Sequence, residues 1–99
     1  MFVALSCFTI ANEKTDEVRA AFCERPHLVD DVPGFVRMQV MSPVDSRAEI
    51  WLVTQWDDEQ SYRDWHHGHL YHESHKGIPA GLKLVKGSAS VRLFDVFAE

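Results

Sequence analysis

The chain has 99 residues and lacks the features that define several large protein classes. Its two cysteines, Cys7 and Cys23, are too few for a disulfide framework, and no apolar run approaches the roughly 18 to 20 residues of a membrane-spanning helix. No basic segment followed by an apolar one opens the chain, so the pattern of a secretory leader is missing. We therefore expect a cytoplasmic protein that does not use a membrane.

Basic residues are also scarce. Ten lysines and arginines face fifteen aspartates and glutamates, which gives a net charge of −5, and no dense basic run is present to neutralise phosphates. Nucleic acid is therefore not an expected partner. The Gly-x-Gly-x-x-Gly and Gly-x-Ser-x-Gly patterns are absent, so no flavin or NAD site and no serine hydrolase are expected.

What remains is an ordinary globular composition, with 45% hydrophobic and 25% charged residues and an aromatic share of 11% that includes three tryptophans. This length suits one domain, residues 1–99. Runs of β-branched and aromatic residues between turn signals predict four strands, over residues 2–10, 35–41, 49–56 and 88–97.

Two helical regions lie between these strands. Apolar residues at three-and-four spacing predict a helix that Thr15 caps and that Pro26 kinks or ends. One of the aspartates at 57–58 is expected to cap the second helix. Gly68 interrupts that helix, and a further helical piece is predicted over 69–76.

The order strand, helix, strand, strand, helix, strand is the ferredoxin-like, split βαβ pattern of an α+β protein, in which helices cover one face of an antiparallel sheet. No element is left to cover the other face. That face is expected to carry several apolar residues or their alternating neighbours, namely Trp51, Val53, Val91, Leu93 and Phe97. An uncovered apolar face predicts a second subunit.

Five of the six histidines lie between residues 66 and 75. One interpretation is a solvent-facing helix end. A second is a zinc site, because His69, His72 and His75 recur at a spacing of three, which places ligands on one helix face. A third is a histidine ligand to heme iron, since neutral imidazole is a common ligand there. The residues alone leave all three open.

Heme also needs a flat aromatic slot and cations that hold its acidic side chains. Arg25, Arg63 and Lys76 are candidates for the cations. The aromatic residues available to line a slot are Phe22, Phe35, Trp51, Trp56, Tyr62, Trp65 and Tyr71.

Three segments carry a family resemblance: VPGFVRMQV, the block WLVTQWDDEQSYRDW, and His75 placed ten residues after Trp65. Together they resemble the antibiotic-biosynthesis-monooxygenase (ABM) superfamily and, within it, the small heme-degrading monooxygenases. The likeness extends from Phe2 to Phe97. It implies a homodimer whose two sheets close into an α+β barrel, with an active site in each subunit between sheet and helices.

The resemblance also implies roles for three residues. His75 matches the proximal ligand of heme iron, and Trp65 matches a tryptophan that distorts the porphyrin. Ser6 stands where the heme-degrading enzymes have an asparagine that hydrogen-bonds the distal iron ligand. A serine hydroxyl is shorter than an amide, so it reaches that position only through water, and turnover is expected to be slow or absent.

By this resemblance the chain is expected to bind heme, as both substrate and cofactor, and to degrade it with O2 and electrons from an external donor or reductase. Phe22, Arg25 and Lys76 are the further candidates for heme contacts. One alternative is a cofactor-independent monooxygenase of a small phenolic or quinol substrate, in which Trp65 and Tyr71 match aromatic positions and a histidine acts as base. A heme-binding module without turnover is the other.

Overall fold

A computed structural model describes residues 1–25, 27–68 and 81–99. Within these ranges the chain forms four strands, two α-helices and one 3₁₀ turn. In chain order these are β1 (Phe2–Thr9), α1 (Thr15–Cys23), the 3₁₀ turn η1 (Leu28–Asp31), β2 (Phe35–Met41), β3 (Glu49–Trp56), α2 (Glu59–His66) and β4 (Ser90–Asp95). None of the described helices is long and apolar enough to cross a membrane. The helical piece predicted over 69–76 lies outside the described residues.

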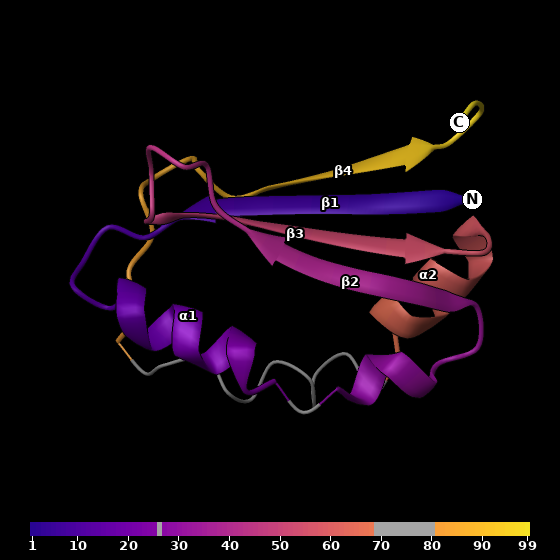
Figure 1. The fold of residues 1–99 in the computed structure, drawn as a ribbon, viewed down its shortest axis with the longest axis horizontal. Helices are drawn as coiled ribbons and strands as arrows, with labels where there is room; N and C mark the ends of the chain where they lie inside the picture. Colours follow the sequence, from indigo (N-terminus) through magenta and orange to yellow (C-terminus); the bar gives the residue numbers. More distant parts are fainter. Residues whose placement is uncertain (26, 69–80) are drawn as a thin grey trace.

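The four strands form one antiparallel sheet in the order β2-β3-β1-β4. Both α-helices lie on the same side of it, and β4 is the strand farthest from α1 (Figure 1). The predicted ferredoxin-like α+β architecture is therefore confirmed. The last strand is shorter than predicted, because its register with β1 runs only from Cys7↔Ser90 to Phe2↔Asp95.

Helix α1 ends at Cys23, three residues before Pro26, so the predicted early end is confirmed. A proline has no N–H for the helical hydrogen-bond ladder and its ring crowds the preceding turn. The predicted cap is wrong: Thr15 is the first helical residue, and no side chain caps this end. Instead the Asn12 side chain accepts a hydrogen bond from the backbone N–H of Lys14 at 3.3 Å.

Helix α2 begins with the cap that the sequence predicts. The Asp58 carboxylate accepts a hydrogen bond from the backbone N–H of Ser61 at 2.8 Å, and this bond lowers the pKa of Asp58. Side chains four residues apart add support along the exposed face, where Gln60 donates to Asp64 and Arg63 pairs with Glu59. The capped helix places Tyr62 and Trp65 over the sheet.

The side of the sheet that faces the helices is buried in two clusters. The first joins η1 and α2 to the ends of β1 and β3, and its buried members are Phe2, Ala4, Val29, Trp56 and Tyr62. The second joins α1 to the opposite ends of the same strands through Ile10, Val18 and Ile50. The helix-facing side of the sheet between them is the place where a site can form.

Strand register assigns the remaining apolar residues to faces. Trp51 and Val53 lie on the outer face, opposite the helices, because they pair with Cys7 and Leu5. By contrast, Val91 and Leu93 pair with Ser6 and Ala4 and therefore share the helix-facing side, so their neighbours Arg92 and Phe94 take the outer face. Phe97 follows β4 and is 95% exposed.

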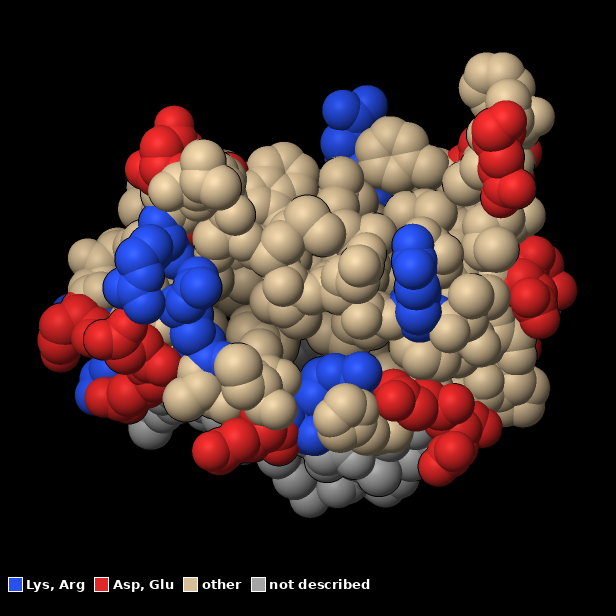
Figure 2. All heavy atoms as spheres, viewed as in Figure 1, with Lys and Arg blue, Asp and Glu red and all other residues tan. Residues whose placement is uncertain are grey.

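The surface over the strands carries few charges. In the view of Figure 2, uncharged side chains gather over the sheet, and acidic and basic side chains lie mainly around its margin. The Trp51 indole on the outer face donates to the Glu49 carboxylate at 2.6 Å, which orients the ring along the strand. Both described α-helices lie on the other side of the sheet, so they do not cover these outer residues.

Gly34 joins η1 to β2 in a turn that only glycine suits. Its φ is +84°, a conformation that side chains with a Cβ disfavour, and a Cβ there would clash with the Ser61 side chain at the start of α2. The Gly34 carbonyl also accepts a hydrogen bond from the backbone N–H of Asp57 at 2.8 Å. The Pro-Gly-Phe motif thus docks the start of β2 against the start of α2.

Replacing Gly34 with alanine is expected to destabilise the protein by about 2 to 4 kcal/mol, from the positive φ and the clash with Ser61 together. Gly87→Ala is the matched control, because Gly87 has a φ of +78° and nothing within 4 Å of the added Cβ. It should cost about 1 kcal/mol. Urea unfolding measures both, and equal losses in the two variants would contradict the docking role of Gly34.

Candidate active site

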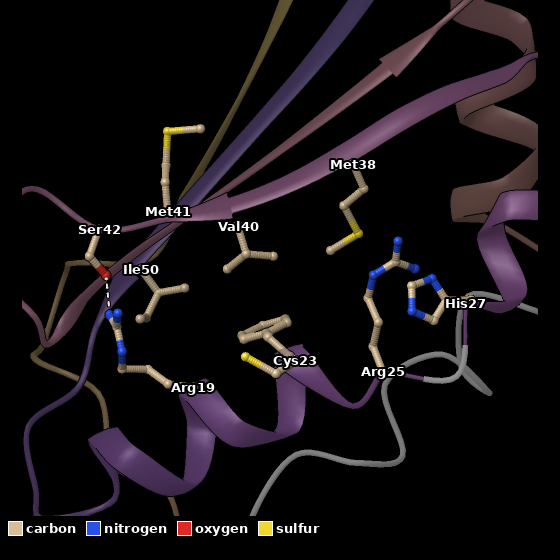
Figure 3. A pocket seen from close by; sticks show the side chains of 10 residues that line it. Arg19, Cys23, Arg25, His27, Met38, Val40, Met41, Ser42 and Ile50 are labelled. Carbon is tan, nitrogen blue, oxygen red and sulfur yellow. Dashed lines mark hydrogen bonds between the residues drawn. The ribbon is translucent and has the colours of Figure 1, made fainter.

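A cavity of about 370 Å³ lies between α1 and the edge of the sheet formed by β2 and β3. Figure 3 shows Arg19 and Cys23 directed from α1 toward the strands and Met38 and Val40 directed from β2 toward the helix, whereas Met41 points away from this space. The lining residues are Arg19, Phe22, Cys23, Arg25, His27, Met38, Val40, Met41, Ser42 and Ile50. This volume lies in the range of small-molecule sites, about 300 to 1,000 Å³.

The middle of the cavity is apolar. Phe22 contributes from α1, while Met38 and Val40 contribute from alternate positions of β2. Met38 adapts easily to a ligand, since its unbranched thioether side chain fills irregular spaces. An aromatic ring on one wall and flexible apolar side chains on the other suit a flat hydrophobic ligand.

Cations stand at the two ends of the cavity (Figure 3). At one end, Arg19 Nη1 donates to the Ser42 hydroxyl at 2.9 Å. At the other end, Arg25 Nη1 pairs with Asp30 Oδ1 at 3.1 Å. An apolar cavity with guanidinium groups at its ends favours a ligand that carries acidic groups.

The Asp30 carboxylate is held by two residues. His27 Nδ1 lies 3.1 Å from Asp30 Oδ2, so each carboxylate oxygen has its own partner. Partial burial raises the pKa of Asp30, but the hydrogen bonds from His27 and Arg25, together with the charges of both residues, outweigh this effect and leave the pKa below its ordinary value. Asp30 is therefore ionised at neutral pH.

Ser6 lies on the helix-facing side of β1, between the two core clusters. It pairs across the sheet with Leu52, which in turn pairs with the cavity residue Val40. Two strand spacings, about 10 Å, separate Ser6 from that wall. The Ser6 hydroxyl makes no hydrogen bond to any described residue, so it is available to a ligand on this side of the sheet.

Trp65 belongs to the last turn of α2 and packs on the first core cluster. Its ring centroid lies 5.5 Å from that of Trp56 and 6.3 Å from that of Tyr62. These contacts hold the indole on the same side of the sheet as Ser6, although it does not line the cavity beneath α1.

The structure brings together part of the predicted site. Phe22 and Arg25 line the same cavity. Ser6 and Trp65 lie on the same side of the sheet as this cavity, but neither residue lines it. Three further candidates, Tyr71, Lys76 and His75, lie outside the described residues, as do His69 and His72 of the zinc interpretation.

Sequence reasoning missed His27 and Asp30. His27 is the one histidine outside the 66–75 cluster, and it has a φ of +57° and contacts Asp30, which also pairs with Arg25. The available signal was Pro26 itself. By ending the helix, it frees the residues that follow to form the separate turn η1 and fold back toward Arg25.

Comparison with known proteins assigns the chain to a family. The family description "Antibiotic biosynthesis monooxygenase" matches residues 1–77, most of the chain. The chain therefore belongs to the antibiotic biosynthesis monooxygenase family, and an oxygenase kind of activity follows from that membership.

Relatives within the family differ in chemistry. The mycobilin-producing heme oxygenase of Mycobacterium tuberculosis (strain ATCC 25618 / H37Rv) is 29% identical over 82 residues, which cover 81% of this chain and 73% of that protein. The heme-degrader MhuD from Mycobacterium tuberculosis, solved with two hemes in its active site, has a TM-score of 0.79 at 24% identity and covers 100% of this chain and 98% of its own. SnoaB, a cofactor-independent oxygenase from Streptomyces nogalater, has a TM-score of 0.76 at 17% identity, covering 99% and 94%.

Since the Ser6 hydroxyl supports no described part of the fold, Ser6→Ala should change the free energy of unfolding by less than about 0.5 kcal/mol. Thr54→Val is the control, because Thr54 lies on the same face of the sheet, in the cross-strand pair of that face next to the one that contains Ser6. Thr54 is buried and donates to the Ala4 carbonyl at 3.4 Å, so its loss should cost about 1 kcal/mol. Chemical denaturation compares them, and a larger loss in Ser6→Ala than in Thr54→Val would assign Ser6 to the fold instead of the site.

Proposed function

We propose that this protein is a heme-degrading monooxygenase that uses O2 and electrons from an external donor. The observation that carries the proposal is the shared cavity of Phe22 and Arg25, apolar in its middle and cationic at its ends. Such a cavity suits a flat apolar ring with acidic side chains. The family membership and the similarity to a heme oxygenase support the same reading.

Several residues would hold the ligand. Phe22 and Met38 would pack on the ring, and Arg25 would bind an acidic side chain through the N–H groups that Asp30 does not occupy. Lys76 is assigned to the other acidic side chain and His75 to the iron, both from the sequence. Bound heme would supply an iron that activates O2 and the carbon ring that is oxidised.

Two more residues on the helix-facing side of the sheet would act on the bound ligand. Trp65, which packs against Trp56 and Tyr62, would press on the bound ring. The Ser6 hydroxyl would donate a hydrogen bond toward the reacting oxygen, through water because its side chain is short. Tyr71 is assigned to the same site from the sequence.

A hemin titration tests the heme proposal. The parent protein should show a saturable Soret shift, and His75→Ala should lose it because the iron loses its ligand. His67→Ala, which removes an exposed histidine from the same cluster, is the matched control and should behave as the parent. No shift in the parent, or the same shift in His75→Ala, would contradict the assignment. Addition of ascorbate in air should then bleach the parent's band.

A Soret band that forms and never bleaches would favour a heme-binding module without turnover. In that case Ser6→Asn, which restores the longer amide of the heme-degrading enzymes, is the variant that should gain bleaching. If hemin does not bind, the cofactor-independent alternative becomes the better account. The fold likeness to SnoaB favours that alternative, and uptake of dissolved oxygen with hydroquinone as substrate would detect it.

We further propose a homodimer that forms through the outer face of the sheet and closes an α+β barrel. Trp51, Val53 and Phe94 lie on this face, and Phe94 is 39% exposed. Exposed aromatic and aliphatic side chains on a sheet face are typical of an interface between subunits.

Phe94→Lys should convert the dimer to a monomer, because it places a charge beside Arg92, whose guanidinium lies 5.5 Å from the Phe94 ring centroid. Val44→Lys is the control, since Val44 is fully exposed in the loop between β2 and β3. Analytical ultracentrifugation measures the mass of each. A monomeric parent, or a dimer that persists in Phe94→Lys, would contradict the proposed interface.

A further inference from the structure

The ionic group at the Arg25 end of the cavity contains a negative charge where a site for an acidic ligand would be expected to hold only positive ones. Asp30 Oδ1 contacts Arg25, and Asp30 Oδ2 contacts His27, each at 3.1 Å. His27 takes part from a left-handed backbone conformation, with φ at +57°, which non-glycine residues adopt infrequently. This turn therefore places the Asp30 carboxylate next to two residues that line the cavity, Arg25 and His27.

Arg25 is only partly engaged by this pairing. Its side chain is 17% exposed and donates one hydrogen bond to a described residue, from Nη1 to Asp30. A guanidinium carries five N–H donors, so four remain for a ligand. Figure 3 shows the Arg25 and His27 side chains directed together toward the Met38 wall of the cavity. Asp30 therefore fixes the guanidinium without blocking it.

The charges at this end of the cavity then nearly cancel. An acidic ligand group bound to Arg25 would be attracted by the guanidinium and repelled by the ionised Asp30 carboxylate just behind it. A neutral ligand of the same shape would feel neither force. The carboxylate thus lowers the affinity for acidic ligands more than the affinity for neutral ones.

We propose that Asp30 is a specificity-determining residue of this site, which attenuates the charge of Arg25 and so sets how strongly the cavity prefers acidic flat ligands over neutral ones. The assignment rests on the proposed function, because it takes the cavity beneath α1 as part of the heme site. It adds a residue that the family resemblance does not supply.

Two porphyrins test the assignment: protoporphyrin IX, which carries two carboxylates, and its neutral dimethyl ester. Neither contains iron, so binding does not require His75. Asp30→Asn keeps the side-chain shape and an oxygen that accepts from Arg25. It should bind the diacid about three- to tenfold more tightly than the parent does, and the ester within about twofold. Fluorescence titration measures both affinities.

Asp31→Asn is the matched control. It removes the same charge from the same turn, but Asp31 forms no ion pair with a described residue, so both affinities should stay within about twofold of the parent. A purely structural role for Asp30 predicts a different pattern, in which Asp30→Asn weakens diacid and ester alike.

The outcomes separate the two proposals. If both porphyrins bind the parent and the diacid-to-ester ratio is unchanged in Asp30→Asn, the Asp30 assignment is wrong and the proposed function stands. If neither porphyrin binds the parent although hemin does, the Asp30 assignment fails and the proposed function stands; if hemin does not bind either, both fail. Equal changes in Asp30→Asn and Asp31→Asn would assign the effect to net charge alone and overturn the specific role.

Discussion

Trp56, completely buried at the end of β3, packs the start of β2 against α2, the helix that carries Trp65. Its ring lies between Phe35 at the start of β2 and two residues of α2, Tyr62 and Trp65, with centroid distances of 5.4, 5.8 and 5.5 Å. Aromatic pairs at such distances contribute about 0.5 to 1.5 kcal/mol each beyond the burial of their surface. The position of Trp65 over the sheet therefore follows from the packing of Trp56.

The division of the core into two clusters decides where a ligand can enter. The cluster around Trp56 supports α2, and the cluster around Val18 supports α1. Between the helices, the sheet presents Ser6 instead of another large apolar side chain, so the two clusters do not merge through β1. The cavity beneath α1 lies on the same side of the sheet as Ser6. It is apolar in its middle and has Arg19 and Arg25 at its two ends.

Much of the fold was predictable because the strands and helices carry clear periodic patterns. Runs of β-branched and aromatic residues identified β2 and β3 to the residue, and the cap at Asp57 or Asp58 and the effect of Pro26 followed from local chemistry. The exceptions depend on pairing, which a single sequence does not display. A register shift between Phe35 and Arg37 leaves Val36 without a partner in the β2–β3 register. The pairing of Ser6 with Val91 places alternate residues of β4 on the helix-facing side of the sheet.

The site was less predictable than the fold. The sequence offered Phe22 as an aromatic residue for a slot and Arg25 as a cation for acidic side chains, and the structure places both on the cavity beneath α1. The contact of Asp30 with Arg25 and His27 could not be assigned, because it requires a turn across Pro26 with a left-handed histidine. The described geometry links these three residues directly, whereas the roles given to His75, Lys76 and Tyr71 still rest on the sequence.

The most direct test of the central claim is a single-turnover reaction of the hemin-loaded protein with isotopically labelled O2 and ascorbate, analysed by mass spectrometry. Catalase must be present, so that hydrogen peroxide formed in solution does not attack the heme. The expected product is an open-chain tetrapyrrole that carries oxygen from the labelled gas. Recovery of intact heme, or a product whose formation catalase abolishes, would contradict the claim.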